Sequence, residues 1–220
     1  MKDSLSVRGI RWFGKNVFAL ELERDGLEFQ PGDCLALFAA DGRVSRPYSL
    51  ASGTSENVLR FVIRLMPKGE VSTYLSTRKP GDLVRISPPF GWFRPGEHAD
   101  ERKFAFIATG TGIAPFLSYL RSNPTNRPEC LLYGVREAQD AVDLPWLRSI
   151  TTLHAAVSRQ DVEGLHRGRV TELLGRLPKG DVDYYLCGLD AMIDEVTNWL
   201  EGQGVDLSRI HRECFFNASY

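Results

Sequence analysis

The most informative segment of this chain is Phe104-Ala105-Phe106-Ile107-Ala108-Thr109-Gly110-Thr111-Gly112-Ile113-Ala114-Pro115. Its first five residues are apolar without a break, a pattern typical of a strand buried on both faces of a parallel sheet. Two glycines then permit a sharp turn, and Ile113–Leu120 has helical spacing. A glycine-rich turn between a buried strand and a helix points backbone N–H groups at an anion such as a pyrophosphate. Pro115 replaces the third glycine of the usual dinucleotide pattern, and the first turn of a helix tolerates it.

The residues that follow this turn continue the alternation of buried strands and helices. Such alternation predicts a parallel sheet with helices on both faces. The expected strands are Cys130–Val135, Thr152–Val157 and Asp183–Cys187, and the expected helices are Val170–Leu177 and Ala191–Gly202.

The residues before the turn have a different texture. Up to about residue 93, short stretches with period-2 alternation lie between turn signals such as Gln30-Pro31-Gly32-Asp33, which predicts an antiparallel barrel or sandwich. Its expected elements are the strands Val17–Leu22, Cys34–Phe38 and Val58–Ile63 and a short helix over Val71–Thr77. The polar, Pro-Gly-containing segment 94–102 is the linker candidate. We therefore predict two domains, an antiparallel β-barrel over 1–98 and a Rossmann-like α/β domain over 99–220.

Composition and charge exclude several classes of protein. With 43% hydrophobic residues and a net charge of -1, the chain can build a core, and no global field would recruit nucleic acid or an anionic membrane. The four cysteines are far apart without a C-x-x-C pair, so we expect free thiols in a reducing compartment and no metal site. No apolar run suits a signal peptide or a membrane span, so a cytoplasmic protein is expected.

Two segments of the first half could hold a flavin. In Arg46-Pro47-Tyr48-Ser49, the ring offers a stacking face, the guanidinium can grip a phosphate and the hydroxyl can bond a ring nitrogen. The alternative is an edge strand with a half-buried Tyr48 and a solvated Arg46. In the loop Met66–Thr73, a glycine opens a short helix whose first N–H groups could bind a pyrophosphate. Glu70 would repel a phosphate unless it points outward, and its better explanation is that it complements the helix dipole.

Three arginines and a serine of the second half could bind a second phosphate. Arg136, Ser158, Arg159 and Arg169 follow strands or begin a helix, where open α/β sheets bind their ligands. Guanidinium groups with a hydroxyl suit a ribose 2′-phosphate. The alternative is a set of scattered, solvated arginines.

The last polar candidates lie near the C-terminus. Gly188 follows a strand and would let a flat ring approach, while the tail Glu213-Cys214-Phe215-Phe216-Asn217-Ala218-Ser219-Tyr220 brings aromatic rings that could cover a flavin. For Cys187 and Phe215, plain core packing is an equally good explanation.

Taken in order, these segments resemble the ferredoxin–NADP⁺ reductase family, and its bacterial FAD-dependent ferredoxin/flavodoxin reductases in particular. The resemblance implies FAD and NADP(H) as cofactors. It also implies hydride transfer between them and electron transfer to or from a separate ferredoxin or flavodoxin, because the chain has no cysteine-rich ferredoxin segment. A monomer is expected.

The resemblance also assigns roles to residues. The polar cluster at the hydride-transfer site corresponds to Ser49, Cys187 and Glu213. The FAD site corresponds to Arg46, Pro47, Tyr48, Ser49, Val62, Ile63, Arg64, Leu65, Glu70, Val71, Ser72, Thr111 and one of the rings Phe216 and Tyr220. The NADP site corresponds to Gly110, Thr111, Gly112, Arg136, Ser158, Arg159, Arg169, Cys187 and Gly188. Whether Phe216 or Tyr220 covers the flavin stays open, since the chain continues beyond the place where the family ends.

Other functions are compatible with the same residues. The nearest are an NAD(P)H-dependent reductase component of an oxygenase system and a free flavin reductase. A function of another class is a non-catalytic subunit that binds flavin and docks onto a larger redox complex.

Overall fold

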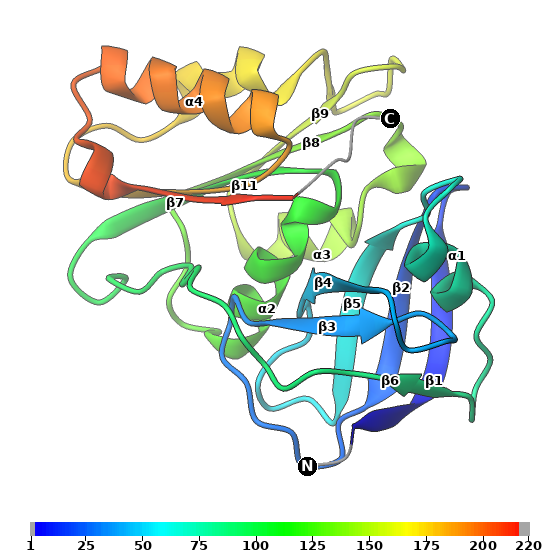
Figure 1. Cartoon of the computed structure of the whole chain (residues 1–220). Coiled ribbons are helices and arrows are strands. Elements are labelled where there is room, and N and C mark those ends of the chain that lie inside the picture. The colour runs from blue at the N-terminus through cyan, green and yellow to red at the C-terminus, as the bar shows by residue number, and fades with distance from the viewer. Residues whose placement is uncertain (1–2, 216–220) are drawn as a thin grey trace. The chain divides into compact units, whose positions relative to one another are not determined.

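The computed structural model describes residues 3–215, which form two compact units. Unit 1 contains the chain up to Trp92 together with Ala114–Ser122, and unit 2 contains Phe93–Ile113 and the chain from Asn123 onward. The chain passes from unit 1 to unit 2 between Trp92 and Phe93, and it returns to unit 1 for one helix. Figure 1 shows the elements of each unit.

Unit 1 is built from antiparallel strands, which confirms the β-rich fold expected for the first half. Its larger sheet has the order β5-β2-β1-β6, and a smaller sheet pairs β3 with β4. Single bridges between Leu37 and Ile86 and between Leu50 and Phe61 connect the two sheets into a half-barrel. The strands are β1 (Ser4–Phe13), β2 (Val17–Glu23), β3 (Cys34–Phe38), β4 (Ser45–Ser49), β5 (Val58–Arg64) and β6 (Leu83–Arg85).

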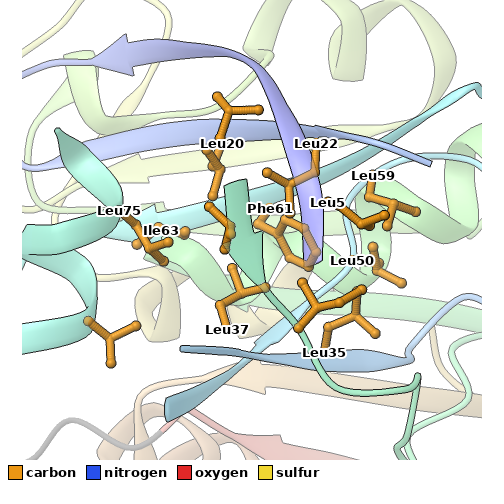
Figure 2. Close-up of a cluster of buried hydrophobic side chains, with 14 of the residues drawn as sticks. Leu5, Leu20, Leu22, Leu35, Leu37, Leu50, Leu59, Phe61, Ile63 and Leu75 are labelled. Carbon is orange, nitrogen blue, oxygen red and sulfur yellow. The ribbon is translucent and has the colours of Figure 1, made fainter. Parts of the chain in front are cut away.

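The core of unit 1 lies between these sheets, and the period-2 alternation explains it. Inward-facing residues of successive strands, among them Leu20, Leu22, Leu35, Leu37 and Phe61, are completely buried and pack together (Figure 2). Two helices complete the unit, namely α1 (Glu70–Ser76), which adds Val71 and Leu75 to this core, and α2 (Ala114–Ser122).

Unit 2 is a parallel sheet of six strands in the order β10-β9-β8-β7-β11-β12, which confirms the expected α/β fold. The first strand of this unit in sequence, β7, lies inside the sheet. The strands β8, β9 and β10 follow on one side of β7, and β11 and β12 lie on the other side. The strands are β7 (Lys103–Thr109), β8 (Cys130–Val135), β9 (Leu153–Val157), β10 (His166–Arg167), β11 (Val182–Gly188) and β12 (Ile210–Cys214).

The helical elements of unit 2 include two α-helices and four short 3-10 helices. The helix α4 (Asp190–Gly202) and the 3-10 helix η3 (Val170–Arg176) pack onto one face of the sheet. The other elements are α3 (Leu144–Ile150) and the 3-10 helices η1 (Gly110–Ile113), η2 (Ala138–Asp140) and η4 (Leu207–Arg209). No helix among residues 3–215 combines the length and the hydrophobicity that crossing a bilayer requires.

Two helical predictions differ from the structure in detail. The segment expected as a helix over Val170–Leu177 is a 3-10 helix that ends at Arg176, because Pro178 follows and cannot continue it. The helix expected from Ile113 begins at Ala114, and the glycine turn before it forms its own 3-10 turn.

Candidate functional site

The glycine-rich turn lies where the parallel sheet changes direction. β7 pairs with β8 on one side and with β11 on the other, and the chain reaches β11 only after it has built β8, β9 and β10. Ligands of open α/β sheets bind beyond the carboxyl ends of the strands at such a switch point. Gly110–Ile113 follows β7 there, and Gly188 ends β11 beside it.

Glycine is needed at this point because the two strand ends are in close contact. A Cβ atom on Gly112 would collide with the carbonyl of Cys187 and would lie 2.7 Å from Cα of Gly188. Gly188 has a φ of +144°, and a Cβ atom there would collide with the hydroxyl of Thr109. The predicted nucleotide-binding residues Gly110, Gly112, Cys187 and Gly188 are therefore brought together within unit 2.

Two hydrogen bonds fix this arrangement. The hydroxyl of Thr109 accepts a bond of 3.0 Å from the backbone N–H of Leu189. The hydroxyl of Tyr133, whose side chain is fully buried, donates to the carbonyl of Gly110 at 3.2 Å. The sequence pattern assigns no role to either hydroxyl. The available signal was that both are polar groups in buried strands, where polar groups must find partners.

The predicted pair Cys187 and Glu213 is also brought together. The residues are register partners on β11 and β12, and the Sγ atom of Cys187 donates to Oε2 of Glu213 at 3.8 Å. Cys187 is completely buried, whereas Glu213 is half-buried. Phe215, the last described residue, donates its N–H to the carbonyl of Gly188 at 2.9 Å. Phe216 and Tyr220, the candidates for covering the flavin, lie outside the described residues.

The candidate 2′-phosphate residues gather at the edge of the same sheet. The N–H of Arg159 donates to the carbonyl of Arg136, and the N–H of Gly168 donates to Val157, each at 3.0 Å. These bonds hold the ends of β8, β9 and β10 side by side, with Arg136, Ser158 and Arg159 exposed. The guanidinium of Arg169 forms an ion pair of 3.2 Å with Glu195 on α4.

In unit 1, strand β4 carries Arg46, Pro47, Tyr48 and Ser49. Arg46 and Pro47 are exposed, Tyr48 is half-buried and Ser49 is buried. Burial raises the pKa of the Tyr48 hydroxyl to about 12, although the charge of Arg46 opposes the shift, so the ring stays neutral. The Oγ atom of Ser49 lies 3.3 Å from Sγ of its register partner Cys34.

The remaining candidate flavin residues lie on β5 and α1. Val62 and Ile63 are buried, and Arg64 and Leu65 are half-buried at the end of β5. The hydroxyl of Ser72 accepts from the N–H of Met66 at 3.1 Å and donates to the carbonyl of Gly69 at 3.3 Å, which shapes the loop before the helix.

This loop leaves its helix terminus open to an anion. A Cβ atom on Gly69 would lie 2.7 Å from Oγ of Ser72, so only glycine fits there. Glu70 is exposed in the first turn and Val71 is buried. The first N–H groups of α1 lack acceptors within the helix, and an exposed Glu70 need not occupy them, so the chain fits the phosphates of a flavin dinucleotide here.

Two family models match successive parts of the chain. The model of the oxidoreductase FAD-binding domain matches residues 13–94, and that of the oxidoreductase NAD-binding domain matches residues 106–198. The electron transfer component of anthranilate 1,2-dioxygenase from Acinetobacter baylyi is 30% identical over 100% of this chain and 68% of its own length. The electron transfer component of toluate 1,2-dioxygenase from Pseudomonas putida is 29% identical over 96% of this chain and 66% of its own length.

Solved structures share the fold. A ferredoxin NADP⁺ reductase from Neisseria gonorrhoeae with bound FAD and NADP has a TM-score of 0.85 at 20% identity and covers 97% of this chain and 98% of its own. The Amycolatopsis cytochrome P450 reductase has a TM-score of 0.86 at 25% identity and covers 98% of this chain and 71% of its own.

The fold and the two matched domains define a flavin- and nicotinamide-dependent oxidoreductase. The chain belongs to the ferredoxin–NADP⁺ reductase family, with FAD and NAD(P) as its cofactors. It spans about two thirds of the length of the curated relatives named above.

Proposed function

We propose that the chain takes a hydride from NADPH onto FAD and passes the electrons to a separate ferredoxin or flavodoxin. The flavin site would lie within residues 1–98 and the nucleotide site within residues 99–220. The observation that carries the proposal is the contact of the Gly110–Gly112 turn with Cys187 and Gly188 at the switch point of the sheet.

The residues of unit 2 have distinct proposed roles toward the nucleotide. The turn offers the N–H of Thr111 and the start of a helix to the pyrophosphate. Arg136, Ser158, Arg159 and Arg169 hold the 2′-phosphate with charge-assisted hydrogen bonds. The absence of a side chain at Gly188 leaves room for the nicotinamide ring.

The residues proposed for hydride transfer are Cys187 and Glu213 of unit 2 and Ser49 of unit 1. Glu213 accepts the Cys187 thiol hydrogen, which keeps that thiol oriented at the end of β11. Ser49, buried on β4, hydrogen-bonds a flavin ring nitrogen. Cys187 and Glu213 shape the pocket of the nicotinamide ring and exclude water from it.

The residues of unit 1 would hold the flavin. Tyr48 stacks on its ring, Arg46 and the first turn of α1 (Glu70, Val71, Ser72) bind its phosphates, and Val62–Leu65 lines its ring and ribityl chain. Pro47 fixes the backbone between the two flavin contacts on β4. Thr111, which belongs to unit 2, is a further candidate for flavin binding. Either Phe216 or Tyr220 would cover the free face. When bound, FAD supplies the ability to accept a hydride and to release electrons singly.

A second candidate function is the reductase component of an oxygenase system. Its support is the kind of relative that the chain resembles, namely electron transfer components of dioxygenases. Such a component would receive electrons from NADH or NADPH in the same way and differ in its acceptor.

A spectrum of the purified protein tests the proposal, which predicts a yellow protein with bound flavin. Anaerobic NADPH should bleach the flavin, and the released cofactor should be FAD. The reduced protein should then reduce a ferredoxin or flavodoxin. A strong preference for NADH would remove the 2′-phosphate role and favour the second candidate. A colourless protein that takes up no flavin would contradict both.

A further inference from the structure

The hydroxyl of Tyr133 joins the glycine-rich turn to a loop that follows in the chain. It donates to the carbonyl of Gly110 at 3.2 Å and accepts from the backbone N–H of Val142 at 3.3 Å. Tyr133 and Val142 are both buried, at 1% exposure each. The turn and the loop are 32 residues apart in sequence, and this hydroxyl connects them within unit 2.

Because the hydroxyl accepts one of these bonds, its proton must point along the other. A hydroxyl has one proton, and the N–H of Val142 already occupies one of its lone pairs. The proton is therefore committed to the carbonyl of Gly110. Burial raises the pKa of Tyr133, so the group keeps its proton and remains a donor.

A fixed carbonyl at Gly110 fixes the next N–H group as well. The peptide bond is planar and trans, so the C=O of Gly110 and the N–H of Thr111 point in opposite directions. Gly110 has a φ of +55°, and glycine allows many other backbone conformations. The 3-10 helix Gly110–Ile113 bonds its own backbone through i→i+3 hydrogen bonds, and the Tyr133 hydroxyl adds a second bond on the Gly110 carbonyl. Without that second bond, the Gly110–Thr111 peptide is freer to tilt its N–H away from the direction that the pyrophosphate needs.

We propose that Tyr133 is a positioning residue for nucleotide binding, whose hydroxyl holds the Gly110–Thr111 peptide with its N–H directed at the pyrophosphate. This inference rests on the proposed function, because it assumes that the turn binds a nicotinamide dinucleotide. Tyr133 itself does not touch the nucleotide. It acts through the turn from the neighbouring strand, where it pairs in register with Ala108.

The test compares Tyr133→Phe with Tyr185→Phe in the flavin-loaded protein. Both residues are buried tyrosines of the same sheet, but the ring of Tyr185 packs against Phe104 and Phe106 rather than against the turn. Removal of the Tyr133 hydroxyl should raise KM for the preferred nucleotide about 5- to 30-fold, the loss expected when one buried hydrogen bond is broken. The kcat should stay within about twofold, and Tyr185→Phe should leave both constants unchanged.

A nucleotide fragment that lacks the pyrophosphate distinguishes a positioning role of Tyr133 from a general loss of structure in the variant. Competitive inhibition by adenosine 2′-phosphate should be the same in Tyr133→Phe and in the wild type, whereas inhibition by NADP⁺ should weaken. For a protein that prefers NADH, adenosine and NAD⁺ replace the two inhibitors. Equal weakening for both compounds, or an unchanged KM, would overturn the inference.

The two proposals fail in different ways. If neither NADPH nor NADH reduces the flavin of the wild-type protein, the proposed function fails and the inference falls with it. If the wild type is reduced and Tyr133→Phe behaves like Tyr185→Phe, only the inference fails.

Discussion

At the scale of single residues, Arg169, which we propose binds a 2′-phosphate, already has acidic partners. The guanidinium pairs with Glu195, and the backbone N–H of the same residue donates to Glu172 at 2.8 Å. Glu172 also lies 3.0 Å from the imidazole of His166. Two carboxylates therefore compete with a phosphate at the residue proposed to bind it.

We expect Glu195→Gln to improve the use of NADPH. The ion pair is exposed, and exposed pairs contribute about 0.2–1 kcal/mol, so kcat/KM with NADPH should rise up to about 5-fold. The value with NADH should not change, because NADH has no 2′-phosphate. Steady-state kinetics with both nucleotides at low ionic strength measure the effect.

Glu201→Gln is the matched control, since Glu201 is exposed farther along the same helix. It should leave both nucleotides unaffected. An equal gain with NADH and NADPH in Glu195→Gln would show that Arg169 does not act on the 2′-phosphate.

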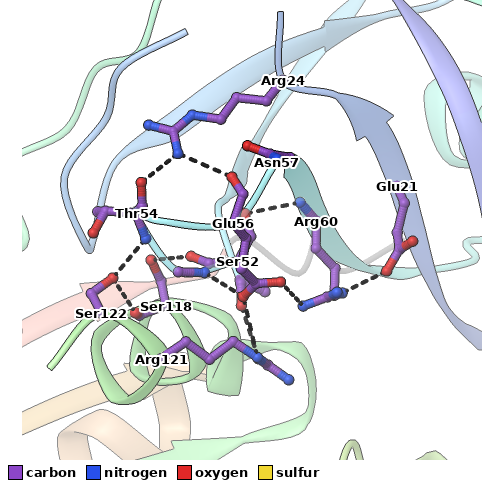
Figure 3. A network of polar contacts seen from close by, with 12 residues as sticks. Glu21, Arg24, Ser52, Thr54, Glu56, Asn57, Arg60, Ser118, Arg121 and Ser122 are labelled. Carbon is purple, nitrogen blue, oxygen red and sulfur yellow. Dashed lines mark hydrogen bonds and ion pairs between the residues drawn. The ribbon is translucent and has the colours of Figure 1, made fainter. Parts of the chain in front are cut away.

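At the scale of elements, α2 owes its place in unit 1 to polar contacts as well as to packing. Ser118 donates its hydroxyl to the carbonyl of Ser52 at 2.8 Å, and Arg121 donates to the carbonyl of Ala51 at 2.9 Å (Figure 3). The carboxylate of Glu56 lies between the guanidinium groups of Arg60 and Arg121, at 3.1 and 3.6 Å. The loop before β5 is thus held to the helix that follows the glycine-rich turn.

We expect Ser118→Ala to destabilise the protein by about 1–3 kcal/mol, because the buried carbonyl of Ser52 would lose its donor. Urea denaturation followed by tryptophan fluorescence measures the change. Ser76→Ala is the control: its hydroxyl bonds within α1 at an exposed position, so its loss should cost much less. Equal effects of the two substitutions would mean that the bond to Ser52 adds no net stability.

At the scale of the whole molecule, the two units are interleaved along the chain. It leaves unit 1 after Trp92, returns at Ala114 and leaves again after Ser122. A cut at a single point therefore cannot separate the units with all their elements intact. The pH dependence of unfolding should therefore be measured on the complete chain.

Histidine burial predicts a loss of stability in mild acid. Burial lowers the pKa of His211, partly offset by Asp183 and Glu97 and reinforced by His98, and burial with the charge of Arg176 lowers that of His154. Below about pH 6.5 the unfolded chain therefore binds more protons than the folded chain. The free energy of unfolding should fall as the pH drops through this range and recover above it.

His211→Phe should reduce this pH dependence, because the new ring keeps the stacking on Tyr185 (4.4 Å between centroids) without a titrating group. Urea midpoints at about pH 7.5 and pH 5.5, above the range in which most carboxylates titrate, measure the effect. A drop as large in the variant as in the wild type would exclude His211 as its source.

Much of the fold could be predicted from the sequence because its signals are local. The unbroken apolar run before Thr109 and the alternation around Val58–Ile63 report burial on both faces or on one face of a sheet. Strand β12 could not be predicted, because Ile210-His211-Arg212-Glu213-Cys214 has little apolar character. The strand lies at the edge of its sheet, where fewer side chains are buried. Helix α3 was not predicted from the sequence, although Asp143 and Pro145 at its start are typical of a helix N-terminus.

Local sequence patterns identify the segments suited to a flavin and to a dinucleotide and give their order, because turn glycines, strand alternation and capping act over a few residues. The tertiary fold alone brings Thr109, Tyr133 and Gly188 together around the glycine-rich turn, with the carbonyl of Gly110 bonded by a hydroxyl from the next strand. That meeting depends on the order β8-β7-β11, which joins residues far apart in the chain, and no local pattern encodes which strands become neighbours.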